Sequence, residues 1–117
     1  MRAVVPWPPS VNHYWAAKGR GRYLSPRARA WRDEAAWAFR QARNGKGKIH
    51  QPVAVFIFAR PPDRRRRDLD NILKAILDAL VYGGVIKDDY QVEEIHLIRK
   101  PPEPGGRVEV YLEVMDP

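Results

Sequence analysis

Apolar residues recur along this chain with two different periods, and each period predicts one kind of element. Between residues 107 and 115 they alternate with polar residues, which is typical of a strand with one buried face. Between residues 69 and 82 they recur every three or four positions, which is typical of an amphipathic helix. The strand's apolar positions are Val108, Val110, Leu112 and Val114, and the helix's are Leu69, Ile72, Leu73, Ile76, Leu77 and Leu80.

A second amphipathic helix is predicted from Pro26 to about Arg43. Ser25 is a suitable N-cap, and proline is well tolerated at the first helical position. The predicted apolar stripe is Trp31, Ala35, Ala38, Phe39 and Ala42, with core packing also expected for Trp37, whereas Arg32, Asp33 and Arg40 are predicted to face water.

The remaining apolar runs predict further strands. A short strand begins at residues 4–5, a buried strand covers residues 53–59 between prolines, and another covers residues 91–100. Residues 10–25 are rich in glycine and basic residues and are predicted to form a loop, while Gly83 and Gly84 are expected to end the second helix in a left-handed conformation. The resulting β-α-β-α-β-β order predicts an α/β fold in which two helices pack on a small mixed β-sheet, forming one domain over residues 1–117.

Charge and composition limit the classes of function that the chain can have. The chain has 21 Lys and Arg against 14 Asp and Glu, a net charge of +7, which favours a polyanionic partner, although a basic protein without a nucleic-acid role is an alternative. Cysteine is absent, which excludes disulfides and zinc-thiolate sites. No apolar run is long enough for a membrane span and the first residues lack a signal-peptide pattern, so a cytoplasmic protein without a membrane partner is expected.

Acidic residues lie inside the most basic stretch of the chain. Arg64–Arg67 lead directly into Asp68 and Asp70, and Asp88 and Asp89 follow the second helix. Carboxylates would repel the phosphates that a basic surface attracts, unless they hold a divalent cation that reverses their sign toward the substrate. This combination predicts a metal-dependent enzyme that acts on the phosphodiesters of a nucleic acid.

The spacing of the acids supports one site but leaves simpler interpretations open. Asp68 and Asp70 are two residues apart and can reach one cation, and Lys74 follows on the same helix face. Asp88 and Asp89 are adjacent, so only one of them is expected to face the site squarely. Alternatively, the first pair caps the helix, Lys74 forms surface ion pairs, and the second pair belongs to an ordinary turn.

Basic and aromatic residues are candidates for DNA contact. Phosphate contacts are predicted for Arg64, Arg65, Arg66 and Arg67 and for Lys18, Arg20 and Arg22, with a solvated charge run as the alternative. Tyr14, Trp15, Tyr23 or Tyr82 could stack on unpaired bases. Asn71 is assigned a structural or supporting role, and His13, His50 and His96 are scattered too widely to supply a catalytic base.

The central motif resembles that of the RusA-type Holliday junction resolvases. The matching residues are Asp68, Asp70, Asn71, Lys74, Asp78 and Leu80, then Gly84, Asp88, Asp89 and Val92, and Pro8, Pro9, Ser10, Asn12, Tyr14 and Trp15 resemble the family's opening segment. The chain differs from the family pattern in the four arginines directly before Asp68.

The resemblance implies a bacterial or phage-encoded homodimer that depends on Mg²⁺, or on Mn²⁺ in its place, and nicks opposed strands of four-way junction DNA in recombination and repair. It implies that Asp68, Asp70 and Asp89 bind the metal and act in catalysis, with Asp88 close by and Lys74 assisting, and it adds Asn12 and Tyr14 to the DNA contacts. Two other functions stay open: a non-catalytic basic DNA-binding module, and a general flap or single-strand nuclease that uses the same acids.

Overall fold

Four strands form one mixed sheet in the order β1-β6-β4-β5, and a separate hairpin joins β2 to β3. The computed structural model describes residues 1–10, 15–18 and 21–115. The elements are β1 (Arg2–Val5), β2 (Trp15–Lys18), β3 (Gly21–Leu24), α2 (Pro26–Arg43), β4 (Val53–Arg60), α3 (Leu69–Tyr82), the short 3-10 helix η1 (Asp89–Gln91), β5 (Val92–Arg99) and β6 (Arg107–Val114). The predicted α/β class and the order of the main elements are confirmed.

The strand β4 lies at the centre of the sheet. It pairs antiparallel with β6 and parallel with β5, and α3 makes the crossover that a parallel connection requires. This placement explains the continuous apolar run in β4, because its residues Val53, Val55, Ile57 and Ala59 are fully buried.

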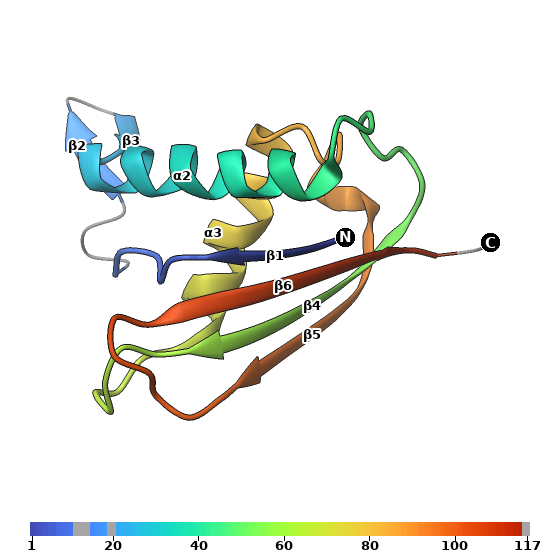
Figure 1. Ribbon diagram of the computed structural model, residues 1–117. Helices are drawn as coiled ribbons and strands as arrows, with labels where there is room; N and C mark the ends of the chain where they lie inside the picture. The colour runs from blue at the N-terminus through green and yellow to red at the C-terminus, as the bar shows by residue number, and fades with distance from the viewer. Residues whose placement is uncertain (11–14, 19–20, 116–117) are drawn as a thin grey trace.

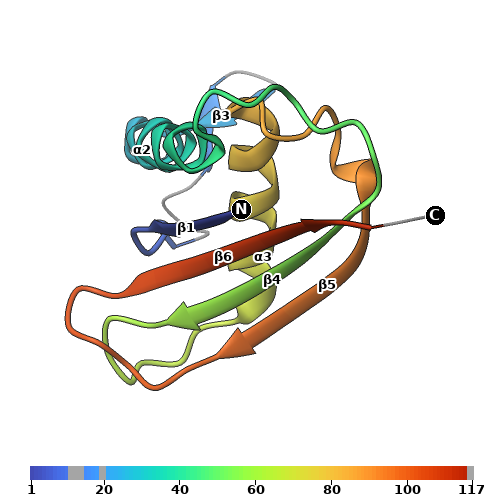
Figure 2. The ribbon, with the colours of Figure 1, turned by 45° about the vertical axis from the view of Figure 1, so that its right-hand side comes forward.

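Both helices pack on the same face of the sheet. In Figures 1 and 2, α3 crosses behind the strands, while α2 runs above β1 and contacts both β1 and α3. The core between them contains Ala3 and Val5 of β1, Trp31 and Phe39 of α2, and Ile76 of α3. No helix in the described ranges is long and apolar enough to cross a membrane.

Both helices begin and end at the residues that the sequence predicts, and the residues that flank them explain these boundaries. The Ser25 hydroxyl accepts a hydrogen bond from the Ala28 amide at 3.1 Å, which makes Ser25 the N-cap of α2. After α3, Gly83 remains right-handed and Gly84 adopts φ 75°, so the predicted left-handed residue is the second glycine.

Three expectations about the first half of the chain are wrong. Part of the predicted loop at 10–25 forms the β2–β3 hairpin. The side chain of Trp37 is 61% exposed, because it lies about 200° around the helix from the buried Ala35. Arg32 does not simply face water, because its guanidinium lies over the ring of Tyr82, with Cζ 3.7 Å from the ring centroid.

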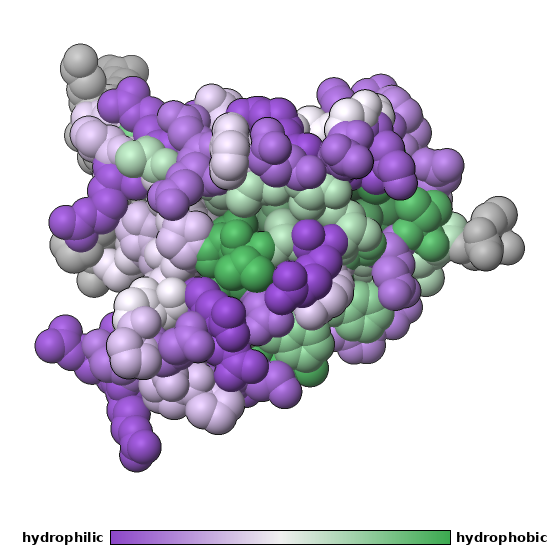
Figure 3. All heavy atoms as spheres, in the orientation of Figure 1, coloured by the Kyte–Doolittle hydropathy of each residue, from purple (hydrophilic) through white to green (hydrophobic). Residues whose placement is uncertain are grey.

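Among the residues that the structure describes, no helix lies on the opposite face of the sheet. It combines aromatic and charged residues: Phe56 and His96 stack with ring centroids 4.6 Å apart, and Glu109 forms ion pairs with Arg2 and Arg60. Figure 3, which shows this side, displays hydrophobic surface between hydrophilic regions. His96 is therefore on the sheet face away from α3.

Candidate active site

The helix α3 carries a row of charged residues that begins at its N-terminus. Asp68 is the N-cap residue, but its side chain makes no capping hydrogen bond, so the simple capping interpretation does not hold for this carboxylate. Asp70, Lys74 and Asp78 follow at four-residue intervals, each about 6 Å further along the axis and on neighbouring parts of one helix face. The row therefore alternates acid, base and acid on one side of α3.

The second pair of acids lies on a loop that we call the acid loop, residues 87–91. Gln91 fixes its shape, because the Gln91 side-chain oxygen accepts from the Lys87 and Asp88 amides at 2.7 and 3.0 Å. The Gln91 side-chain amide donates to the carbonyls of Ile49 and Gln51 at 2.8 and 3.0 Å. This one side chain thus ties the acid loop to the segment that precedes β4.

The two acids of the acid loop have different surroundings. A backbone hydrogen bond from Tyr90, at 2.9 Å, and a side-chain interaction with Asp89 lower the pKa of Asp88, while the interaction with Asp88 and burial raise the pKa of Asp89. The Asp88 carboxylate caps η1, and Asp89 is the first residue of that 3-10 helix. The prediction that only one of them faces the site squarely stays a prediction.

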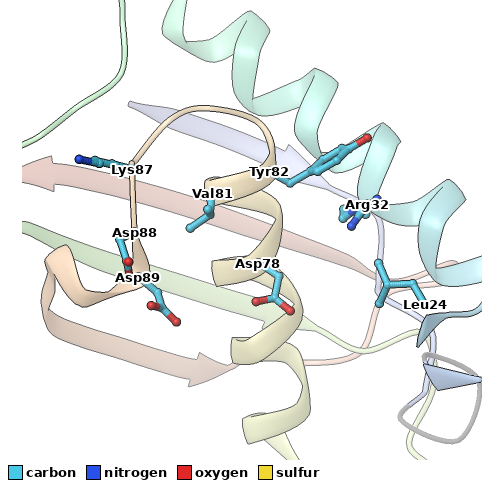
Figure 4. A pocket seen from close by; sticks show the side chains of 8 residues that line it. All are labelled: Leu24, Arg32, Asp78, Val81, Tyr82, Lys87, Asp88 and Asp89. Atoms are coloured by element: carbon cyan, nitrogen blue, oxygen red, sulfur yellow. The ribbon is translucent and has the colours of Figure 1, made fainter. Parts of the chain in front are cut away.

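The acid loop and the C-terminal half of α3 line a cavity of about 540 Å³, which we call the acid cavity. Burial raises the pKa of Asp78, the charge of Asp89 raises it further, and Lys74 opposes both effects. In Figure 4 the carboxylates of Asp78 and Asp89 project into the space between α3 and the loop. The described residues that line this cavity are Leu24, Arg32, Asp78, Val81, Tyr82, Lys87, Asp88 and Asp89.

A second cavity, of about 590 Å³, lies at the N-terminal end of α3 and is mainly basic. We call it the basic cavity. Its described lining residues are Trp7, Pro8, Pro9, Ser10, Arg27, Arg65, Arg66, Arg67, Asp68, Asn71 and Ile72. It brings the opening Pro8-Pro9 segment beside the arginine run and beside Asp68. Asn71 is exposed next to this acid, so a position at the site fits better than a purely structural role.

The arginines of residues 64–67 differ in their surroundings. Arg67 is half-buried: it forms two hydrogen bonds with Asp63, lies 5.9 Å from the centroid of the Trp7 ring, and accepts through its carbonyl a 2.7 Å hydrogen bond from Arg99. The bond from Arg67 holds the pKa of Asp63 at about 2. Arg64, Arg65 and Arg66 are exposed. The structure therefore fixes one arginine and leaves the other three side chains available to a polyanion.

The candidate metal ligands form two groups along α3. Asp68 and Asp70 lie at its start, and Asp78, Asp88 and Asp89 lie near its end. Asp78 is about 12 Å further along the helix axis than Asp70. Within the described residues no three His, Cys, Asp or Glu side chains are close enough together to hold one ion. The donor chemistry nevertheless fits a hard divalent cation, because every candidate is a carboxylate and three of them line one cavity.

Comparison with known proteins identifies the family of this chain. The model of the family described as endodeoxyribonuclease RusA matches residues 6–113. The chain belongs to the RusA endodeoxyribonuclease family. It is 41% identical over 113 residues to the crossover junction endodeoxyribonuclease RusA of Escherichia coli strain K12, covering 96% of this chain and 92% of the relative. It is also 38% identical over 112 residues to the protein of that name from Enterobacteria phage HK97, covering 93% and 90%.

The RusA family match includes the residues that line both cavities. Some of the predicted DNA contacts involve residues that the structure does not describe. Asn12, Tyr14 and Arg20 lie outside the described residues, as does His13. Lys18 and Arg22 lie in the β2–β3 hairpin, and only the backbone of these two residues is described. Their predicted contacts with DNA stay predictions.

Sequence reasoning missed several residues of the two cavities. Arg32 and Lys87 line the acid cavity, and Trp7 and Arg27 line the basic cavity. Asp78 was noticed only as a continuation of the helix face. The sequence contained a signal for two of these residues. Lys87 directly precedes Asp88 and Asp89, and Trp7 directly precedes the Pro8-Pro9 segment. Nothing in the helical pattern of α2 pointed to Arg27 or Arg32.

Proposed function

We propose that this chain resolves Holliday junctions as a metal-dependent endodeoxyribonuclease that makes paired nicks in opposed strands. Family membership supports the enzyme class, and the similar proteins of Escherichia coli and phage HK97 are named crossover junction endodeoxyribonucleases. The observation that carries the proposal is the row of charged residues along α3, which leads from a basic, arginine-lined cavity to the cavity lined by Asp78, Asp88 and Asp89.

We assign Asp68, Asp70, Asp88 and Asp89 to binding of Mg²⁺, with Mn²⁺ able to take its place. The position of Asp88 and Asp89 in the lining of one cavity supports this assignment, because carboxylate oxygens are ligands that Mg²⁺ prefers. When bound, the ion supplies Lewis-acid polarisation of the phosphoryl oxygen and a more acidic bound water.

Lys74 is assigned an electrostatic role. It lies one helical turn from Asp70 and one from Asp78, and its charge lowers the pKa of Asp78. The same point charge can stabilise negative charge that develops on the scissile phosphate. The same charge helps to hold the phosphate beside the carboxylates, which would otherwise repel it.

The exposed arginines are assigned to phosphate contacts that position the DNA without reading its sequence. Arg65 and Arg66 line the basic cavity at the start of α3, and Arg64 is exposed beside them. A strand that enters across these residues would continue along the charged row of α3 toward the acid loop. The fixed Arg67 defines the edge of this path.

The direct test of the proposed function is incubation of the purified chain with end-labelled four-way junctions in Mg²⁺ and in EDTA, in competition with duplex and flap DNA. We expect nicking in Mg²⁺ only, and stronger competition by unlabelled junctions than by the other structures. Binding without any nicking would indicate a non-catalytic DNA-binding module. Equal preference for flaps would indicate a general nuclease.

Replacing Arg65 and Arg66 together with alanine should weaken binding to junction, duplex and flap DNA to a similar degree. Both side chains are exposed, and each released phosphate contact contributes ~0.9 to the slope of log K against log salt on duplex DNA. The slope should therefore fall by up to about two units, measured by fluorescence anisotropy over a salt series. The matched control is the double replacement of Arg29 and Arg40, which removes the same charge from the exposed side of α2; an equal effect there would indicate net charge alone.

Replacing Gln91 with alanine should lower nicking by roughly 10- to 100-fold, the usual cost of losing a residue that orients metal ligands. The substitution removes four hydrogen bonds that hold the acid loop, while the acids themselves remain. Mg²⁺ titrations of nicking should show a higher half-saturating concentration, with junction binding in EDTA unchanged. The control is Gln41→Ala on the exposed side of α2. An unchanged Mg²⁺ requirement would show that the loop needs no such support.

We also propose that the active form is a homodimer. A four-way junction presents two symmetry-related strands, and each chain carries one set of candidate acids. A two-fold axis relates two identical surfaces in the way that two opposed cuts require. The chain should therefore sediment as a dimer at micromolar concentration in the absence of DNA, and a monomeric mass would contradict this.

A further inference from the structure

The acid cavity has a second wall that metal chemistry does not use. Arg32 from α2 stacks on Tyr82 at the end of α3, with the guanidinium Cζ 3.7 Å from the ring centroid. Leu24 and Val81 add apolar surface to this wall. Figure 4 shows the carboxylates of Asp88 and Asp89 on the loop side of the cavity, the stacked pair on the opposite side, and Asp78 on α3 between them.

The lining selects the kind of group that this cavity can bind. Its charged lining residues are three carboxylates, Arg32 and Lys87, which leaves a net negative charge that disfavours a phosphate where no cation is bound. A flat and uncharged group fits better, since aromatic rings and guanidinium planes stack on nucleobases. Carboxylates also accept hydrogen bonds from the amino groups of bases. The volume of about 540 Å³ is within the range usual for small-molecule sites.

The exposure of Tyr82 and the position of the acid cavity also support a flat, uncharged ligand. The side chain of Tyr82 is 49% exposed although Arg32 lies over its ring, so aromatic surface is left for another flat group to cover. The cavity is also lined by Asp88 and Asp89, which the proposed function assigns to the metal. A base held here would place its own backbone next to the site of cleavage.

We propose that the acid cavity binds one unstacked nucleobase of the junction, held against the Arg32–Tyr82 pair, beside the phosphodiester that is cut. Bases at a branch point can leave the stack at less cost than bases within a duplex. The cavity therefore orients the strand for cleavage and favours junctions over continuous duplex. This inference rests on the proposed function and names the part of the substrate that the site recognises.

The test is a thermodynamic cycle between the protein and the DNA. Junctions carry a single abasic nucleotide at each position that flanks the nicked bond in turn, and Kd is measured in EDTA so that no strand is cut. For the wild-type chain we expect affinity to fall roughly 5- to 150-fold at one position, the range for loss of one base stack. Tyr82→Ala should lose similar affinity for the intact junction and show no further loss at that abasic position.

Three further variants separate stacking from other effects. Tyr82→Phe keeps the ring and should behave like the wild type. Arg32→Ala removes the other half of the stacked pair, so it should also reduce the abasic effect, and it provides a second variant if Tyr82→Ala fails to fold. Tyr90→Ala is the control: Tyr90 is next to Asp89 and 86% exposed but does not line the cavity, so this variant should keep the full abasic effect.

The outcomes distinguish this inference from the proposed function. If the wild-type chain nicks the intact junction but no abasic position changes its Kd, the base-binding inference is wrong and the nuclease proposal stands. The same holds if Tyr82→Ala and Arg32→Ala are as sensitive to the abasic nucleotide as the wild type. If the wild-type chain neither binds nor nicks the junction, both proposals fail.

Discussion

Replacement of Asp70 with asparagine is expected to lower the nicking of a four-way junction by at least about a hundredfold, a typical loss when one group that stabilises the transition state is removed. Asp70 lies in the first turn of α3, exposed, one helical turn before Lys74. Asparagine keeps the shape of the side chain but removes the negative charge that a divalent cation requires. Because the variant also loses one charge that repels phosphate, it should bind the junction equally well or more tightly.

Single-turnover nicking and Kd in EDTA measure the two effects of Asp70→Asn separately. The matched control is Asp33→Asn on the exposed side of α2, which removes the same charge away from both cavities and should nick like the wild type. Asp70 also lies where a negative charge favours the helix dipole. A lower melting temperature with loss of binding would therefore indicate a structural role, and normal nicking would remove Asp70 from the mechanism.

Dimers that combine one wild-type chain with one Asp70→Asn chain are expected to cut only one strand of the junction. In the homodimer each set of acids acts on one of two symmetry-related strands, so one inactive subunit removes one cut. On a supercoiled plasmid with an extruded cruciform, the mixed dimer should convert the linear product into nicked circles. The purified mixed dimer, isolated through two different affinity tags, permits this measurement.

The two parental homodimers, carried through the same subunit exchange, are the controls for the mixed dimer. The wild-type pair should give linear DNA, and the pair with two Asp70→Asn chains should give neither product. If the mixed dimer gives as much linear DNA as the wild type, one subunit performs both cuts, and the two-fold arrangement of active sites is wrong.

The periodic parts of the fold were predictable because burial alone decides them. The pattern of α3 fixes which of its faces packs on the sheet, and Ile72, Ile76 and Leu80 are buried as predicted. The uninterrupted apolar run of β4 marks a strand covered on both edges, and the structure places it between β6 and β5. Local capping chemistry at Ser25 fixed the start of α2. These features depend on residues that are close in sequence and on the burial of apolar side chains away from water.

The parts of the site that depend on contacts between distant segments could not be predicted. The stack of Arg32 on Tyr82 joins two helices, and no periodicity in either helix reveals it. The orientation of Asp89 follows from a 3-10 turn that Gln91 stabilises through the carbonyls of Ile49 and Gln51, about 40 residues away. The motif residues named the acids as one candidate group, which stays a prediction, and their distribution between α3 and the acid loop required the structure.

The charge pattern predicted more of the function than of the geometry. Acids beside an arginine run suggested a metal and a phosphodiester, and the family match agrees with that class of enzyme. From the same pattern, residues 64–67 were predicted to form one basic surface. In the structure the surroundings of the four arginines differ, because Arg67 contacts Asp63 and Trp7 while the other three are exposed.

The most direct test of the central claim is the product that the wild-type chain makes from a supercoiled cruciform plasmid in Mg²⁺. The proposed dimer with one set of acids per chain should give mainly linear DNA, from two opposed cuts within one binding event, and no product in EDTA. Nicked circles as the end product, together with a monomeric mass, would contradict paired resolution and indicate a simple nicking nuclease. Linear product that forms equally well in EDTA would contradict the role assigned to the acids of α3 and the acid loop.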